Sequence, residues 1–67
     1  MALSDNVRKY RCKAQLSQTQ LAKMVGVDPS AICKIEKGLF IPTVVLLDDI
    51  ASVLKVSLDE LVHGNDT

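Results

Sequence analysis

Hydrophobic residues recur every three or four positions along most of this chain, which is the spacing of a helix with one buried face. Leu3, Val7, Tyr10 and Ala14 form the first such series. Residues that begin or end helices separate one series from the next. They are Gly26, Asp28, Pro29, Gly38, Pro42, Ser57 and Gly64. The pattern predicts five short helices with short links, and therefore an all-α domain over residues 1–67.

The last four predicted helices each begin at a residue that favours a helix N-cap. Ser17 and Ser57 are each followed three residues later by Gln or Glu, which is the capping-box pattern. Asp28 precedes a proline, and Thr43 precedes the fourth helix. The predicted buried positions are Leu21, Met24 and Val25 in the second helix, Ala31, Ile32 and Ile35 in the third, Leu46, Leu47, Ile50, Val53 and Leu54 in the fourth, and Leu61 and Val62 in the fifth.

The second and third predicted helices are joined only by Gly26-Val27-Asp28. Such a link is too short for antiparallel packing, so the two helices should cross steeply as a helix-turn-helix. Gly26 allows a left-handed turn, and Ala22 is small where the third helix must approach. The outward face of the third helix is small, polar and cationic; it contains Pro29, Ser30, Cys33, Lys34 and Lys37. This face suits a DNA major groove, and the alternative is an ordinary solvated face.

The charges are distributed unevenly, although the net charge of the 67 residues is zero. Residues 1–37 contain seven Lys and Arg against three Asp and Glu, a balance of +4. Residues 38–67 contain one Lys against five acidic residues, a balance of −4. Such asymmetry indicates either a face that binds a polyanion or a dipole that only aids solubility, and charge alone leaves both open.

The composition disfavours several other classes of protein. No apolar stretch approaches 18 residues and no signal-peptide pattern is present, so we expect a cytoplasmic protein that spans no membrane. Cys12, Cys33 and His63 lack the spacing of metal ligands, and a single His gives no nucleophile–base pair. We therefore expect no enzyme, cofactor, metal or small-molecule ligand. Free thiols are the expected state of both cysteines, and oxidation sensing by Cys33 is the alternative.

The segment LSQTQLAKMVGVDPSAICKIEKG, residues 16–38, resembles the motif of the Xre/Cro-type helix-turn-helix family, relatives of the lambdoid phage repressors. Pro42-Thr43, Ile50-Ala51, Leu54 and the segment VSLDEL at 56–61 match the family's last two helices. The resemblance covers residues 5–62, with the motif itself at 17–37. It implies the five-helix repressor fold, binding to double-stranded DNA through the major groove, and a homodimer on a palindromic operator.

The resemblance also implies roles for individual residues. Those on base-contacting positions are Pro29, Ser30, Cys33 and Lys34, and those on phosphate-contacting positions are Gln18, Lys37 and the amide of Gly38. Arg11 and Glu36 fall on the positions of an ion pair between the first helix and the end of the third. Proline and cysteine make no strong polar base contacts, so Ser30 and Lys34 should carry most direct readout. Gln15 replaces a frequent glycine, which predicts an irregular first turn.

More hydrophobic residues are present than one small core needs. The surplus lies in the link after the third helix and on the fourth helix; it consists of Leu39, Phe40, Ile41 and Val45. Together with Leu58 on the last helix, these residues are the expected dimer interface. Such a patch usually marks an interface, here either a homodimer or the partner surface of an antitoxin or other protein-interaction module. The second helix exposes Thr19, Gln20 and Lys23 rather than acidic residues, which favours a repressor over an activator.

Overall fold

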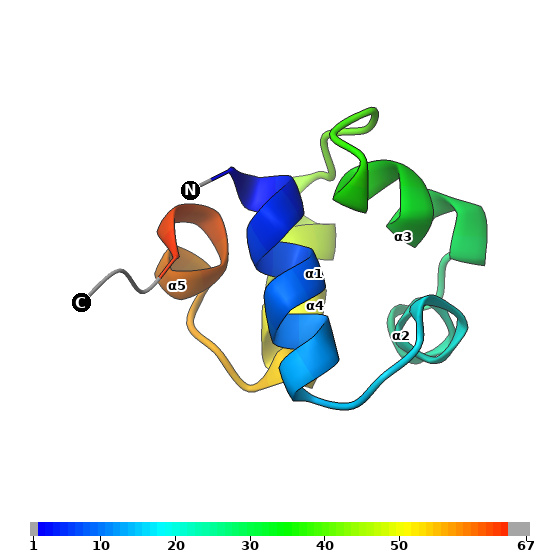
Figure 1. Cartoon of the computed structure of the whole chain (residues 1–67), viewed down its shortest axis with the longest axis horizontal. Helices are drawn as coiled ribbons and strands as arrows, with labels where there is room; N and C mark the ends of the chain where they lie inside the picture. The colour runs from blue at the N-terminus through cyan, green and yellow to red at the C-terminus, as the bar shows by residue number, and fades with distance from the viewer. Residues whose placement is uncertain (1, 65–67) are drawn as a thin grey trace.

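The computed structural model describes residues 2–64, and these form five α-helices with no strand among them. The helices are α1 (Leu3–Lys13), α2 (Gln18–Val25), α3 (Pro29–Glu36), α4 (Val44–Leu54) and α5 (Leu58–His63). α1 and α4 lie at the centre, with α5 on one side and the α2–α3 pair on the other (Figure 1). The all-α, five-helix prediction is confirmed. No helix of this part of the chain is long and apolar enough to cross a membrane.

The predicted N-caps form as hydrogen bonds. The Ser17 hydroxyl accepts from the Gln20 amide at 3.0 Å, and the Gln20 side chain accepts from the Ser17 amide at 2.8 Å. Ser57 and Glu60 form the same capping box at 3.0 and 3.1 Å. Thr43 Oγ1 accepts from the first turn of α4. These bonds pair amides that would otherwise have no partner within their helices, and so they fix where α2, α4 and α5 begin.

The core is built from residues of all five helices. Its buried members are Val7, Tyr10, Leu21, Ala22, Ile32, Ile35, Leu47, Ile50, Ala51, Leu54 and Leu61. Two residues predicted on buried faces are instead exposed. Ala14 caps the end of α1 and lies beyond its buried stripe. Met24 is 58% exposed because it lines an open groove rather than the core.

A buried polar residue joins the two ends of the fold. Asn6 has no exposed surface, and its side-chain amide donates to the carbonyl of Val62 at 3.4 Å. Gly64 follows with a positive φ of 78°, and a Cβ on it would lie 3.1 Å from the Asn6 amide oxygen. The end of α5 is therefore seated on α1 through Asn6, a contact that the hydrophobic pattern did not predict.

Among residues 2–64, two turns place residues other than glycine in the left-handed conformation. Gln15, after α1, has φ 59°, and Lys55, after α4, has φ 60°. A side chain in this region costs about 1–2 kcal/mol relative to the ordinary helical conformation. The irregular turn predicted at Gln15 is thus present, whereas the one at Lys55 had no counterpart in the sequence pattern.

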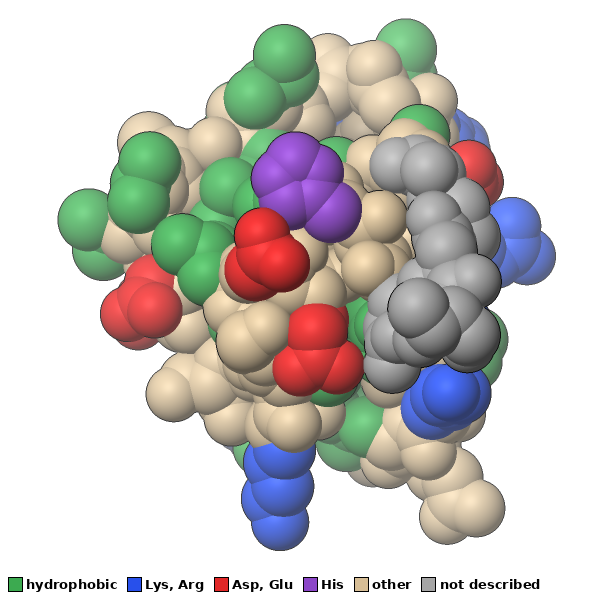
Figure 2. All heavy atoms as spheres, turned by 90° about the vertical axis from the view of Figure 1, so that its left-hand side faces the viewer, with side chains coloured by type: hydrophobic (Ala, Val, Ile, Leu, Met, Phe, Trp, Pro, Cys, Tyr) green, Lys and Arg blue, Asp and Glu red, His purple; other side chains and the backbone are tan. Residues whose placement is uncertain are grey.

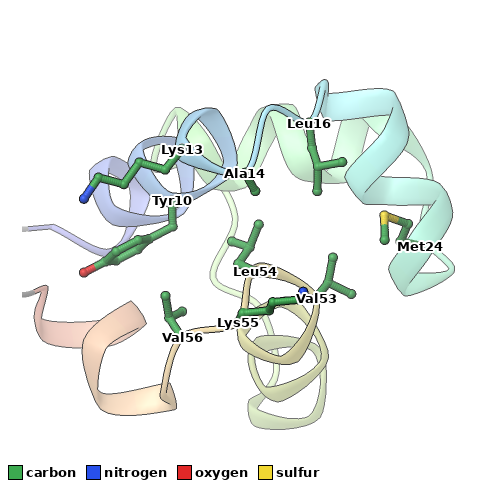
Figure 3. A pocket seen from close by; sticks show the side chains of 9 residues that line it. All are labelled: Tyr10, Lys13, Ala14, Leu16, Met24, Val53, Leu54, Lys55 and Val56. Atoms are coloured by element: carbon green, nitrogen blue, oxygen red, sulfur yellow. The ribbon is translucent and has the colours of Figure 1, made fainter.

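A shallow groove of about 520 Å³ opens between the C-terminal ends of α1, α2 and α4 (Figure 3). Leu16, Met24 and Val53 point toward one another across it. The other lining residues are Tyr10, Lys13, Ala14, Leu54, Lys55 and Val56. All of them belong to α1, α2, α4 and the adjoining links, so the groove is separate from the outward face of α3.

Candidate nucleic-acid interface

A three-residue turn sets the geometry of α2 and α3. Gly26 adopts φ 77°, and the amides of Gly26 and Val27 both donate to the carbonyl of Ala22. Ala22 is fully buried, so its small side chain lets the two helices pack closely. Figure 1 shows α2 nearly end-on while α3 runs across the view. The two axes therefore cross steeply, as the length of the link predicts.

The two faces of α3 divide as the sequence predicts. Ile32 and Ile35 are buried against the core, and Ala31 is half-buried. Cys33 is half-buried on the outward side. The exposed residues of that side are Pro29, Ser30, Lys34 and, at the C-cap, Lys37. The structure therefore brings all the sequence-predicted base-contacting residues to one side of a single short helix.

An ion pair fixes this helix to the rest of the molecule. Arg11 Nε lies 2.6 Å from Glu36 Oε2, and Arg11 Nη2 donates to Glu36 Oε1 at 3.1 Å. The two side chains are 13% and 4% exposed, respectively. The hydrogen bond with Glu36 raises the pKa of Arg11 above its usual value, and burial opposes this rise. The pair is thus bidentate, charged and largely removed from solvent, as the resemblance implied.

Two further hydrogen bonds extend the pair into a network. Arg11 Nη1 donates to the carbonyl of Leu16 at 2.8 Å, in the link between α1 and α2. Gln18 Nε2 donates to Glu36 Oε1 at 3.1 Å, from the first turn of α2. Neither bond was predicted from the sequence. Together they hold α1, α2 and α3 in one fixed relative orientation.

The three residues assigned to phosphate contacts differ in how free they are. The Gln18 amide nitrogen carries two hydrogens, of which one points to Glu36. Lys37 is exposed at the end of α3. The Gly38 amide donates to the carbonyl of Ile35 at 3.1 Å, and the Leu39 amide donates to the carbonyl of Lys34 at 2.9 Å. This pair of bonds is a Schellman C-cap. A phosphate at Gly38 would therefore have to share an N–H that the helix end already uses.

An Asp–Ser pair begins α3. Asp28 Oδ2 accepts from the amide of Ser30 at 3.0 Å and from the hydroxyl of Ser30. The hydrogen bond from the Ser30 hydroxyl lowers the pKa of Asp28 most, and the bond from the Ser30 amide lowers it further. The positive charge of Lys34 adds to the effect. Asp28 is therefore an ionised, fully exposed acceptor beside the outward face of α3 at neutral pH.

The surplus hydrophobic residues lie at the surface. Ile41 is 85% and Val45 72% exposed, with Leu39 and Phe40 also exposed. Val44, which the hydrophobic pattern did not predict at this surface, is exposed as well. Leu58 is half-buried, and with Asp59, Val62 and His63 it lines a shallow hollow on α5. Figure 2 looks onto this side of the molecule and shows hydrophobic side chains gathered beside His63.

Within the part of the chain that the structure describes, the cysteines and His63 do not form a metal-binding cluster. Cys12 and Cys33 are both free thiols. Within residues 2–64, no group of three His, Cys, Asp or Glu side chains is placed to hold a metal ion. His63 lies 3.8 Å from Asp59, one turn earlier on α5, and both side chains are exposed. The outward face of α3 is therefore the candidate site.

A steeply crossed α2–α3 pair inside five helices defines a helix-turn-helix protein. The Helix-turn-helix family model matches residues 7–61, and the chain belongs to this family, as one of its Xre/Cro-type transcriptional regulators. An uncharacterized HTH-type transcriptional regulator of Archaeoglobus fulgidus is 36% identical over 64 residues, which is 96% of this chain and 91% of the relative.

Solved structures agree with this assignment. The P22 c2 repressor, in complex with a synthetic operator, superposes with a TM-score of 0.90 at 31% identity, over 97% of this chain and 98% of that one. SinR, a master regulator of biofilm formation solved in complex with DNA, gives a TM-score of 0.83 at 30% identity, over 88% of this chain and 95% of that one.

Proposed function

We propose that this protein is a cytoplasmic, sequence-specific repressor of transcription that binds a palindromic operator in double-stranded DNA as a homodimer. The observation that carries the proposal is the exposed polar and cationic face of α3, held in place by the network of Arg11, Glu36 and Gln18. A recognition helix must keep its orientation within a fraction of an ångström to read bases, and a buried bidentate pair supplies that rigidity. The similar P22 c2 repressor was solved in complex with a synthetic operator, which supports the binding of operator DNA by this fold.

The roles of the outward residues follow from their chemistry and position. Ser30 and Lys34 lie one turn apart on the exposed side of α3, so both can reach base edges. The Lys34 ammonium carries only donors and suits guanine O6 and N7. Pro29 and Cys33 lie against the bases and add apolar contacts, for example with a thymine methyl group. Lys37 at the helix end and the second N–H of Gln18 face phosphates, which position the helix without reading sequence.

Dimerisation accounts for the exposed hydrophobic residues. The outward face of one α3 helix has few cations, so one monomer gains limited affinity from phosphate contacts. The surface formed by Leu39, Phe40, Ile41, Val45 and Leu58 would become buried between two copies, which explains why apolar side chains occur there. Two copies related by a two-fold axis would present their α3 helices one DNA turn apart, about 34 Å.

Selection of bound sequences from a random DNA pool tests the proposal. We expect an enriched palindrome whose half-sites are centred about 10 base pairs apart, and affinity that falls steeply between low and high salt. The matched control is the Lys34→Ala, Lys37→Ala double variant, which should bind all sequences more weakly and enrich no base at the Lys34 position of each half-site. A wild-type pool without an enriched motif would contradict the proposal.

A second candidate is a protein-interaction module of the same fold, such as an antitoxin. The exposed hydrophobic surface and the apolar groove between α1, α2 and α4 favour it, because both could bind a protein. In that case binding to generic DNA would be absent at low as well as at high salt. A salt-dependent DNA titration therefore separates the two candidates.

A further inference from the structure

The hydroxyl of Ser30 has its only hydrogen committed within the protein. It donates that hydrogen to Asp28 Oδ2, and the same oxygen also accepts from the Ser30 amide at 3.0 Å. A serine hydroxyl carries one hydrogen and two lone pairs. While the bond to Asp28 is present, Ser30 therefore offers a base only acceptor sites.

The bond to Asp28 is stronger than the alternatives available to this hydroxyl. A carboxylate is a charged acceptor, and hydrogen bonds to charged groups are about twice as strong as neutral ones. Lys34, one turn further along α3, adds a positive charge that helps keep Asp28 ionised. A base carbonyl is neutral, so rotating the hydroxyl toward it would exchange a charge-assisted bond for a weaker one.

We infer that Asp28 is a positioning residue that makes Ser30 an acceptor, so that the base facing Ser30 must present an exocyclic amine. In the major groove this amine is N6 of adenine or N4 of cytosine. Guanine and thymine present acceptors there, and these would meet the Ser30 oxygen and the negative charge of Asp28. This inference rests on the proposed function, and it specifies what one part of the proposed site reads.

The resulting specificity has a distinctive form. Every base pair contains one amine-bearing base, so Ser30 would determine which strand carries it rather than whether the pair is A·T or G·C. Lys34, with donors only, would read guanine on the same face one turn away. One short helix would thus present an acceptor at Ser30 and a donor at Lys34. With these two side chains it would specify a different base at each of two positions.

The test uses operator duplexes that carry each of the four bases at every half-site position. Dissociation constants are measured by fluorescence anisotropy for the wild type, Ser30→Ala and Asp28→Gly. Glycine is an N-cap only slightly weaker than aspartate, so Asp28→Gly should keep α3 while freeing the hydroxyl. Asp49→Asn, an exposed change on α4, removes the same charge and leaves Ser30 untouched.

The expected result is a preference of about fivefold for adenine and cytosine over guanine and thymine at one position per half-site. Ser30→Ala should flatten this position and no other. Asp28→Gly should also bind amine-bearing and other bases equally well at this position. Its preference at the Lys34 position should persist, and this persistence would show that the variant is folded and binds DNA in the same orientation. Asp49→Asn should bind every sequence more tightly and keep the preference for amine-bearing bases.

Three results would overturn the inference. In the first, the wild type prefers guanine or thymine at the position where Ser30→Ala loses its preference. In the second, Ser30→Ala loses its preference at no position. In the third, Asp28→Gly still prefers adenine and cytosine over guanine and thymine as the wild type does. Failure of the wild type to distinguish any sequence would instead refute the proposed function, so the two failures are distinguishable.

Discussion

Replacing Glu36 by glutamine should unfold the domain far more readily than any exposed charge substitution. The change leaves Arg11 charged but gives it a neutral partner in place of a carboxylate. The Arg11 side chain is only 13% exposed, so water cannot replace that partner fully. The change also replaces one of the two carboxylate oxygens, which now accept from Arg11 and Gln18, by an NH₂ group that can only donate. The bond from Arg11 to the Leu16 carbonyl is retained, which limits the loss.

The magnitude follows from the burial of the pair. Removing one partner of a buried ion pair costs about 3–5 kcal/mol, and the retained Leu16 bond places Glu36→Gln near the lower figure. A domain of this size loses about 4–8 °C in melting temperature per kcal/mol, so we expect a fall of at least about 10 °C. The raised pKa of Arg11 means that its side chain stays positively charged in a neutral buffer, so Glu36→Gln measured there removes the partner of a charged group.

Thermal and urea unfolding followed by circular dichroism measure this effect. Asp59→Asn is the matched control, because it removes one carboxylate from an exposed pair on α5 and should change the melting temperature by no more than a degree or two. The Arg11→Gln, Glu36→Gln double variant should be less destabilised than the sum of its single variants. A Glu36→Gln protein that melts within two degrees of the wild type would refute the reasoning.

Three further predictions concern the turns, the reading helix and the dimer. Gln15→Gly should raise the free energy of unfolding by about 0.5–1 kcal/mol, since glycine adopts φ 59° without steric cost; urea unfolding checks this, and a destabilised variant would contradict it. Lys34→Ala should remove about 1–3 kcal/mol of discrimination at one operator position, whereas Lys37→Ala should weaken all sequences alike and lower the salt slope by about one, both measured on single-base operator variants. A uniform loss in Lys34→Ala would show that Lys34 contacts phosphate instead. Val45→Glu should turn a dimer into a monomer in sedimentation at micromolar concentration, and a wild type that sediments only as a monomer, on or off DNA, would contradict the dimer.

Features encoded in a few neighbouring residues were predictable from the sequence. Capping boxes at Ser17 and Ser57 and the Asp28-Pro29 pair set the helix starts, and each depends on contacts within four residues. The split of α3 into a buried and an outward face follows from helical period alone. The pairing of Arg11 with Glu36, 25 positions apart, was accessible only through the resemblance to a family.

Features that depend on how whole helices end and pack were not predictable. Asn6 lies three residues after Leu3 and four before Tyr10, so its position on the buried face was visible, but its partner on α5 was not. Met24 fits the helical period yet remains exposed, because it lines an open groove between α1, α2 and α4. Lys55 takes a left-handed conformation usually given to glycine or asparagine, and its residue type gave no signal.

Sequence-specific binding through α3 is the central claim, and a specificity ratio tests it most directly. The selected operator and a scrambled duplex of the same length and composition are titrated with the protein at one physiological salt concentration, with fluorescence anisotropy as the readout. The account predicts that the operator binds at least about a thousandfold more tightly than the scrambled duplex. Equal affinity for the two duplexes, or no binding to either, would contradict it.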